Sequence, residues 1–92
     1  MTRTEFIEAV WKRCAGYTWG EVEGVIDVAV GVIKSELING GEVNISGFGK
    51  FSVRERAARS GRNSRTGEEI QVDAYKIPYF TASKSFKTAV KS

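Results

Sequence analysis

An arginine-rich stretch without apolar cover, Gly47 to Glu69, is the part of the sequence that most restricts the fold. It reads GFGKFSVRERAARSGRNSRTGEE and has no long apolar side chain between Val53 and Ile70. Such a segment buries too little apolar surface to offset the entropy that is lost on ordering, so it cannot form part of a core. Apolar residues recur on both sides of it. The sequence therefore predicts a folded body from which this stretch projects into solvent.

Five arginines dominate this stretch, against one acid, Glu55, before its tip; they are Arg54, Arg56, Arg59, Arg62 and Arg65. Soluble edge strands usually mix charges of both signs, whereas this series is almost purely arginine, so protection against aggregation alone does not explain it. The guanidinium group presents a planar fork of donors to phosphate, and arginine also enters narrow, A·T-rich minor grooves. The stretch is thus predicted to be an arm that grips a polyanion.

Length and charge distribution favour a dimer whose anion-binding face lies on the second half of the chain. Ninety-two residues make one small domain, and a body that also carries an arm is short of core, so a second subunit is expected to complete it. Residues 1–45 carry four basic and seven acidic side chains, a net charge of −3, whereas residues 46–92 carry ten basic and four acidic ones, a net charge of +6. This asymmetry is typical of a nucleic-acid or anionic-surface face.

Two helices are predicted to precede the arm. Thr2 with Glu5, and Thr18 with Glu21, have the spacing of capping boxes, and apolar residues follow each pair at helical intervals. The second helix is apolar over a wide arc, which indicates burial on more than one side, as at a subunit interface. The run Asn-Gly-Gly at residues 39–41 is expected to end this helix, because these residues accept left-handed backbone conformations.

From Glu42 the apolar pattern changes to a period of two, which predicts strands. A short strand ends near Ile45, a second continues through Val53 into the arm, and residues 69–79 return as a third. Pro78 is expected at an edge or a bulge, because proline has no N–H to donate to a sheet. The predicted fold is α+β, with two N-terminal helices, a three-stranded antiparallel sheet with a long β-hairpin arm, and a short C-terminal helix. One domain spans residues 1–92, with a helical dimerisation base (1–41), a sheet (42–80) whose arm covers about 54–76, and the final helix (81–92).

Three local features of the arm and its exit are also predicted. From Arg56 the arginines recur every third residue, which a flat strand cannot keep on one face, so a bulge or a strong twist is expected near Ala57 and Ala58. Residues 63–67 are expected to form the turn at the tip, with Gly67 at a positive φ. Thr81 is expected to cap the last helix, whose Phe86, Ala89 and Val90 would face the body.

Composition excludes several classes of site. The chain has no histidine and one cysteine, Cys14, so an intrachain disulfide and a His/Cys metal site are both excluded. No serine or threonine has an activating base, and GFGKF opens a strand and lacks the P-loop pattern, so no enzyme, cofactor or small-molecule substrate is predicted. The first residues show neither a secretory signal nor a membrane span, which predicts a cytoplasmic protein.

Longer motifs extend from one end of the chain to the other. They are TEFIEAV near the start, NGGEVNISGFG in the middle, GFGKFSVRERAARSGRN followed by TGEE in the arm, and KIPYF and KSFKTAVK near the end. Together they resemble the bacterial histone-like HU and integration host factor family of DNA-binding proteins. The resemblance implies an intertwined dimer whose helices form the base and whose two arms wrap duplex DNA through the minor groove. It also implies a nucleoid-associated, bacterial or phage-encoded protein, either a homodimer or a heterodimer with a paralogue.

The resemblance assigns DNA-binding roles to residues inside and outside the arm. In the arm these are Arg54, Arg56, Arg59, Arg62 and Asn63. Flanking phosphate contacts are implied for Arg3, Lys84 and Lys87, helped by free N–H groups at helix N-termini. Arg65 and Lys76 are added on charge and position.

Ser64 departs from the family pattern, which has proline after the Arg-Asn pair at the arm tip, where it wedges between base steps. Serine has no apolar face to replace a lost stacking contact, so shallower DNA kinks are predicted than for relatives with proline at this position. Two alternative functions also remain open. One is a site-selective architectural factor like integration host factor, and the other is a dimerisation module whose arms bind RNA or a protein partner.

Overall fold

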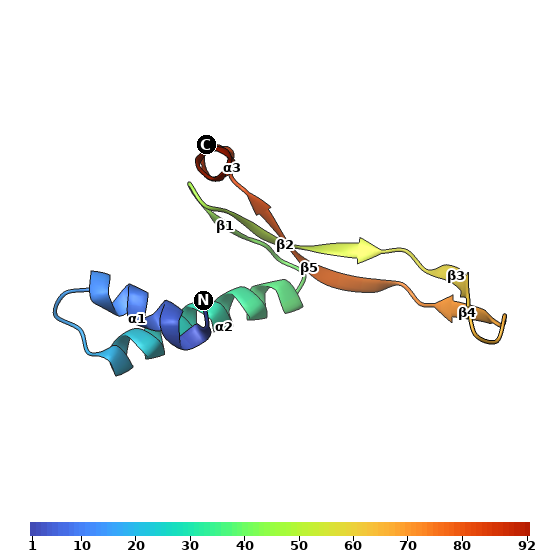
Figure 1. The fold of residues 1–92 in the computed structure, drawn as a ribbon, viewed down its shortest axis with the longest axis horizontal. Coiled ribbons are helices and arrows are strands. Elements are labelled where there is room, and N and C mark those ends of the chain that lie inside the picture. Colours follow the sequence, from blue (N-terminus) through green and yellow to red (C-terminus); the bar gives the residue numbers. More distant parts are fainter. The chain divides into compact units, whose positions relative to one another are not determined.

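Three helices and five strands account for most of the chain, and a computed structural model describes all residues 1–92. The elements are α1 (Arg3–Arg13), α2 (Trp19–Ile38), β1 (Val43–Ile45), β2 (Gly49–Arg56), β3 (Arg59–Arg62), β4 (Glu69–Val72), β5 (Tyr75–Ala82) and α3 (Lys84–Lys91). The chain divides into two compact units, Met1–Ser35 and Glu36–Ser92, and the boundary falls within the last turn of α2. None of the helices has the length and apolar character that crossing a bilayer requires. The α+β fold with a hairpin arm is confirmed (Figure 1).

Both predicted capping boxes are present at the N-termini of α1 and α2. The Thr2 hydroxyl accepts a hydrogen bond from the Glu5 N–H at 3.2 Å, and the Glu5 carboxylate accepts one from the Thr2 N–H at 3.3 Å. In the second box, the Glu21 carboxylate accepts from the Thr18 N–H at 2.9 Å while the Glu21 N–H donates to the Thr18 hydroxyl at 3.1 Å. The bond from the Thr18 backbone lowers the pKa of Glu21, because it stabilises the ionised form.

A Schellman motif ends α2 at the Asn-Gly-Gly run of residues 39–41, as the sequence predicted. Gly40 has a φ of +82°, and its N–H donates to the Leu37 carbonyl at 3.0 Å. The Gly41 N–H donates to the Glu36 carbonyl at 2.9 Å, so two carbonyls of the last turn are satisfied. The chain then enters β1 at the predicted place.

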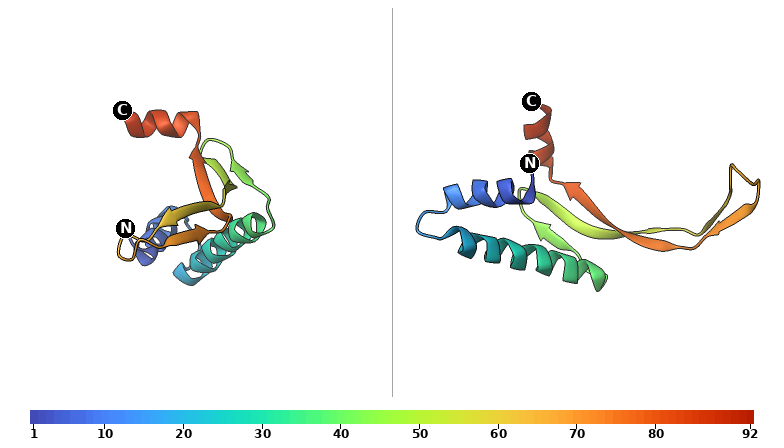
Figure 2. Two further views of the ribbon diagram at one scale, coloured as in Figure 1. Left: turned by 90° about the vertical axis from the view of Figure 1, so that its right-hand side faces the viewer. Right: turned by 60° about the horizontal axis from the view of Figure 1, so that its bottom comes forward.

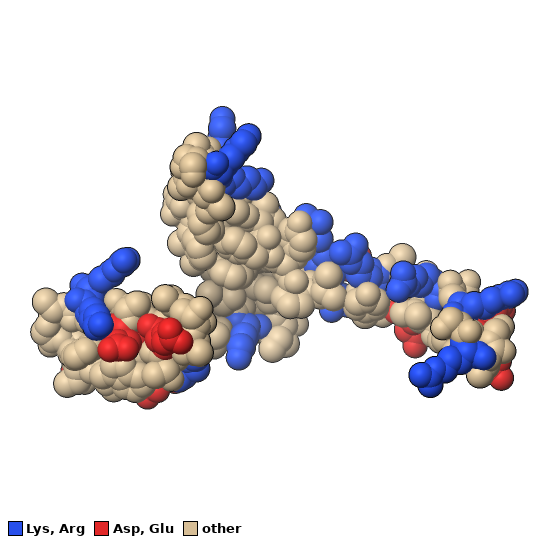
Figure 3. Space-filling model, viewed as in Figure 1, with Lys and Arg blue, Asp and Glu red and all other residues tan.

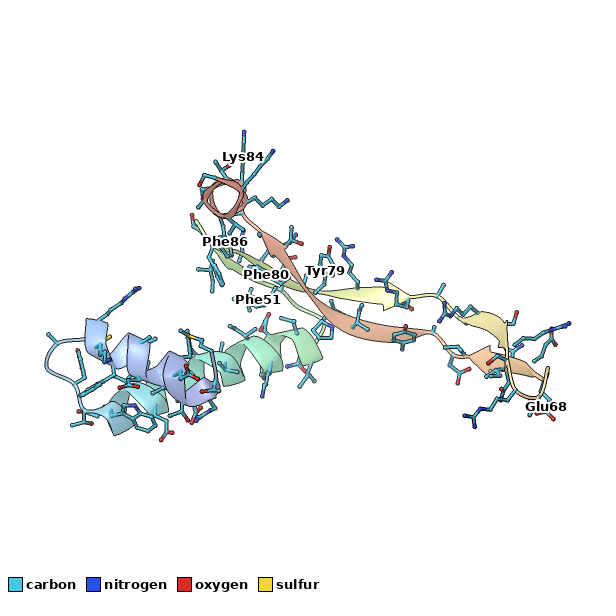
Figure 4. All side chains as sticks on the ribbon, in the orientation of Figure 1. Phe51, Glu68, Tyr79, Phe80, Lys84 and Phe86 are labelled. Atoms are coloured by element: carbon cyan, nitrogen blue, oxygen red, sulfur yellow. The ribbon has the colours of Figure 1, made fainter.

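An antiparallel sheet in the order β1-β2-β5 forms the body of the second unit. Pro78 belongs to β5 and pairs with Val53 of β2. Because β5 is an edge strand, the missing N–H of proline is tolerated there, as predicted. Aromatic rings cover one face of this sheet, with centroids between 4.8 and 6.4 Å apart. The cluster consists of Phe48, Phe51, Phe80 and Phe86. Because Phe86 belongs to α3, these rings hold the last helix against the sheet (Figure 4).

The arm is an extension of the β2–β5 ladder that is interrupted once. Arg56 pairs with Tyr75 and Arg59 pairs with Val72, so two residues are skipped on each strand and the register does not change. Of the two alternatives predicted near Ala57 and Ala58, the bulge with an extra residue was therefore wrong, and the strong twist stays a prediction. The return strand is likewise divided into β4 and β5, and β5 runs on to Ala82. The gap between the two ladders is equal on both strands, and Figure 2 shows that the arm changes direction along its length.

The cap of α3 also differs from the prediction. Thr81 lies in β5 opposite Lys50, whereas Ser83 is the N-cap, and its hydroxyl accepts from the Phe86 N–H at 3.2 Å. Pairing of β5 with β2 continues to Ala82 because Phe80 completes the aromatic cluster, and this delays the helix by two residues. Phe86 faces the sheet as predicted, but Val90 is 72% exposed.

The core within one chain is small, as the length predicts. Only Ile7 and Val22 are buried hydrophobic residues. On α2, by contrast, Val25 is 69% exposed and Val28 is 68% exposed. The wide apolar arc predicted for this helix is therefore present but uncovered within the chain.

Replacing Gly49 with alanine should destabilise the second unit. Gly49 is buried at the start of β2, and a Cβ there would lie 2.6 Å from both the Phe80 ring and the Thr81 carbonyl oxygen. Overpacking of this kind costs about 1–3 kcal/mol. Chemical denaturation followed by circular dichroism measures the loss. The matched control is Gly61→Ala in β3, where a Cβ would meet nothing within 4 Å; an equal loss in both variants would contradict the packing argument.

Candidate nucleic-acid interface

Exposed basic side chains follow the arm from its base to its tip. Arg54 and Arg56 alternate along β2 and share one face of the ladder, Arg59 and Arg62 lie in β3, and Arg65 lies in the terminal turn. All five are exposed. Figure 3 shows lysine and arginine atoms along the arm and over α3, with a few acidic atoms below the arm and at its tip. These arginines therefore form one extended, solvent-facing series.

No carboxylate forms an ion pair with an arginine of the arm. The ion pairs within 4.0 Å join Arg3 to Glu23 and Asp27, Lys12 to Glu8, and Lys50 to Glu42, and none involves an arginine of the arm. Arg54 and Arg56 carry their charge on the opposite face of the ladder from Glu55. Acidic side chains occur in the arm, and Glu69 stands opposite Arg62 in the β3–β4 ladder, but none forms an ion pair with an arginine. The exposed arginines are therefore available to a polyanionic ligand.

The tip of the arm is a closed turn built on Asn63. Its N–H donates to the Glu68 carbonyl at 2.8 Å, its carbonyl accepts from the Gly67 N–H at 2.7 Å, and its side-chain oxygen accepts from the Arg65 N–H at 2.9 Å. Gly67 has the predicted positive φ, +74°. Ser64 is exposed, and its N–H makes no hydrogen bond in the chain. Asn63 was placed in the predicted turn, but the hydrogen bond of its side chain, which is typical of an Asx-turn, was not predicted.

Lys84 and Lys87 lie three residues apart at the start of α3 and are both exposed. Figure 4 shows Lys84 on the side of α3 away from the labelled Phe86. They belong to the same unit as the arm and add to its basic surface. Lys76 also belongs to this unit, but it lies opposite Glu55 in the ladder, on the other face from Arg54 and Arg56.

Arg3 differs from the other predicted site residues because it forms ion pairs with carboxylates. It belongs to the first unit, and its guanidinium donates to Asp27 at 2.5 Å and to Glu23 at 3.3 Å. The hydrogen bond with Asp27 is the main reason that the pKa of Arg3 is raised. A phosphate would have to compete with these two carboxylates, so the DNA contact of Arg3 stays a prediction.

One contact of the site was not predicted at all. The guanidinium carbon of Arg54 lies 3.5 Å from the centroid of the Tyr79 ring. The two residues are 25 positions apart in sequence, and their proximity depends on the register between β2 and β5.

No group of three or more His, Cys, Asp or Glu residues could hold a metal ion.

Comparison with known proteins identifies the family of the chain. The family model for bacterial DNA-binding proteins matches residues 1–91. The DNA-binding protein HU of Staphylococcus aureus is 45% identical over 91 residues, which cover 99% of this chain and 100% of the relative. Among solved structures, an Anabaena HU-DNA cocrystal structure matches with a TM-score of 0.89 and 36% identity, covering 98% of this chain and 97% of that one. An HU mutant from Thermotoga maritima matches with a TM-score of 0.71 and 29% identity, over 98% and 99% of the two chains. The chain therefore belongs to the bacterial DNA-binding protein family, of which HU is a member.

Proposed function

We propose that this protein is a histone-like architectural protein that binds duplex DNA through the minor groove with two arms and bends or compacts it with little sequence specificity. The observation that carries the proposal is the series of exposed arm arginines without a single carboxylate partner. Family membership supports it, since the Anabaena relative was crystallised with DNA. The chain is proposed to act without catalysis, in association with the bacterial or phage nucleoid.

The proposed DNA contacts divide into three groups. The arm residues, from Arg54 to Arg65, hold the groove and its phosphates through forked arginine donors. Lys84 and Lys87 on α3 contact flanking phosphates, and Lys76 adds charge on the second face of the arm. Arg3 contributes by exchanging its carboxylate partners for a phosphate.

Dimerisation is proposed to complete the core. The uncovered valines of α2 line a shallow groove together with Gly20 and Gly24, and a second copy of the chain fits this apolar surface. Burying it would supply the hydrophobic stabilisation that one chain lacks. The dimer also gives the protein its two arms, so the single domain of residues 1–92 functions as a pair.

The dimer predicts that thermal stability depends on protein concentration. The thermal midpoint should rise with concentration, because association stabilises only the folded state. Val28 is 68% exposed within one chain, so Val28→Asp should have little effect on the stability of a monomer. If α2 lies in the dimer interface, the same change should lower the thermal midpoint and weaken association in sedimentation velocity. Ala15→Asp, in the exposed turn after α1, is the control and should leave association unchanged. A cooperative, helical monomer at micromolar concentration would disprove the dimer.

Counterion release predicts the effect of removing one arm arginine. Neutralising Z phosphates gives log K a slope of about −0.9Z against log salt. Arg59→Ala should weaken binding to all duplexes alike and flatten this slope by about two units if each arm of the dimer loses one contact. Fluorescence anisotropy from low to moderate salt measures the slope on DNA duplexes of mixed sequence. Binding to RNA is measured in parallel under the same conditions.

The control variant removes an equal charge elsewhere in the chain. Lys12→Ala acts on α1, where Lys12 is paired with Glu8, and should keep the wild-type slope. An unchanged slope in Arg59→Ala would move the contact surface away from the arm. Tighter binding to RNA than to DNA would favour the alternative function.

The tip predicts shallower DNA kinks than proline-bearing relatives would make. Serine offers little apolar surface to replace stacking, which costs a few kcal/mol per unstacked step. Ser64→Pro should increase the bend, and the turn tolerates it because the Ser64 N–H donates no hydrogen bond. Energy transfer between the ends of a short duplex at saturating protein measures the bend. Sharp bending by the wild type, unchanged in Ser64→Pro, would show that another tip residue enters the stack.

A further inference from the structure

Tyr79 and Arg54 meet across the base of the arm because of the strand register. Ser52 pairs with Tyr79 and Arg54 pairs with Ile77, so Arg54 and Tyr79 are diagonal neighbours on one face of the β2–β5 ladder. Diagonal neighbours are within reach of each other when one side chain is aromatic and the other is long. The guanidinium of Arg54 indeed lies over the Tyr79 ring, 3.5 Å from its centroid.

Packing of the core does not account for Tyr79. The aromatic cluster of the second unit uses Phe51 and Phe80, which pair with each other and therefore lie on the opposite face of the ladder from Tyr79. The Tyr79 hydroxyl makes no hydrogen bond within the chain, and the ring is only partly covered. The Tyr79 ring, labelled in Figure 4, contacts one charged group, the guanidinium of Arg54.

An aromatic ring holds an arginine differently from a carboxylate. A carboxylate would occupy the N–H donors of the guanidinium and cancel its charge, as Asp27 and Glu23 do for Arg3. A ring contacts only the flat face, so the N–H edges stay free for a second partner. An arginine that is already ordered also loses less conformational freedom when it binds.

We propose that Tyr79 is a positioning residue for Arg54, which its ring holds at the base of the arm with the donor edges free for a DNA phosphate. The inference rests on the proposed function and adds a residue that charge alone does not reveal. Arg56 and Tyr75 provide a comparison, because they pair directly on the same face but form no such stack.

A double-mutant cycle on duplex binding tests the proposal. Tyr79→Leu should weaken binding by about twofold to fivefold per arm, the range to which an exposed cation–π contact converts. Tyr79→Leu made in the Arg54→Ala background should hardly change the affinity for duplex DNA, because the guanidinium that Tyr79 positions is absent. Tyr79→Phe keeps the ring and should bind like the wild type. Tyr79→Val, which retains strand propensity, replaces the leucine variant if that one does not fold.

The salt dependence and a matched pair separate positioning from other roles. Tyr79→Leu removes no charge and should keep the wild-type slope of log K against log salt, whereas Arg54→Ala should flatten it. The corresponding cycle with Tyr75→Leu and Arg56→Ala should be additive.

Equal losses from Tyr79→Leu in the wild type and in Arg54→Ala would overturn the inference, since the ring would then act on the fold or touch DNA itself. No loss in either background would overturn it as well. A wild-type protein that does not bind duplex DNA would instead refute the proposed function, and the inference with it.

Discussion

The antiparallel ladder between β2 and β5 is the interaction on which the rest of the second unit depends. Eight residue pairs, from Gly49 with Ala82 to Arg56 with Tyr75, run without a break from the aromatic cluster into the arm. At one end the ladder places Phe51 and Phe80 against α3, and at the other it lifts Arg54 and Arg56 into solvent. Backbone pairing thus continues into the arm, where the side chains offer no apolar cover.

Basic side chains outside the arm form ion pairs, as Lys50 does with Glu42 in the second unit, whereas the arm arginines form none. In the first unit, Arg3 and Lys12 are each held by carboxylates, which uses their charge within the protein. In the arm, acids are present but none reaches an arginine, and the one partner of Arg54 is an aromatic ring. A ring orders the side chain and leaves both charge and donors available. This difference supports the proposal that the arm arginines bind a ligand.

Apolar surface explains why a second copy of the chain is part of the proposed function. Two buried hydrophobic residues are a small core for 92 residues, and the exposed valines of α2 would remain in water in a monomer. The arm increases this deficit because it takes residues from the body. A partner that covers α2 therefore stabilises the fold and supplies the second arm together.

Local signals in the sequence determined the α+β fold, both capping boxes, the glycine end of α2, the edge position of Pro78 and the arginine arm, since each depends on neighbouring residues. The start of α3 and the division of the arm were decided by tertiary structure: pairing across β2 and β5 extends the strand past Thr81 and skips residues equally on both sides. The contact of Arg54 with Tyr79 and the pairing of Arg3 with Asp27 were decided in the same way. These contacts join residues more than 20 positions apart, and no periodicity or spacing encodes which side chains a strand register or a helix pair will bring together.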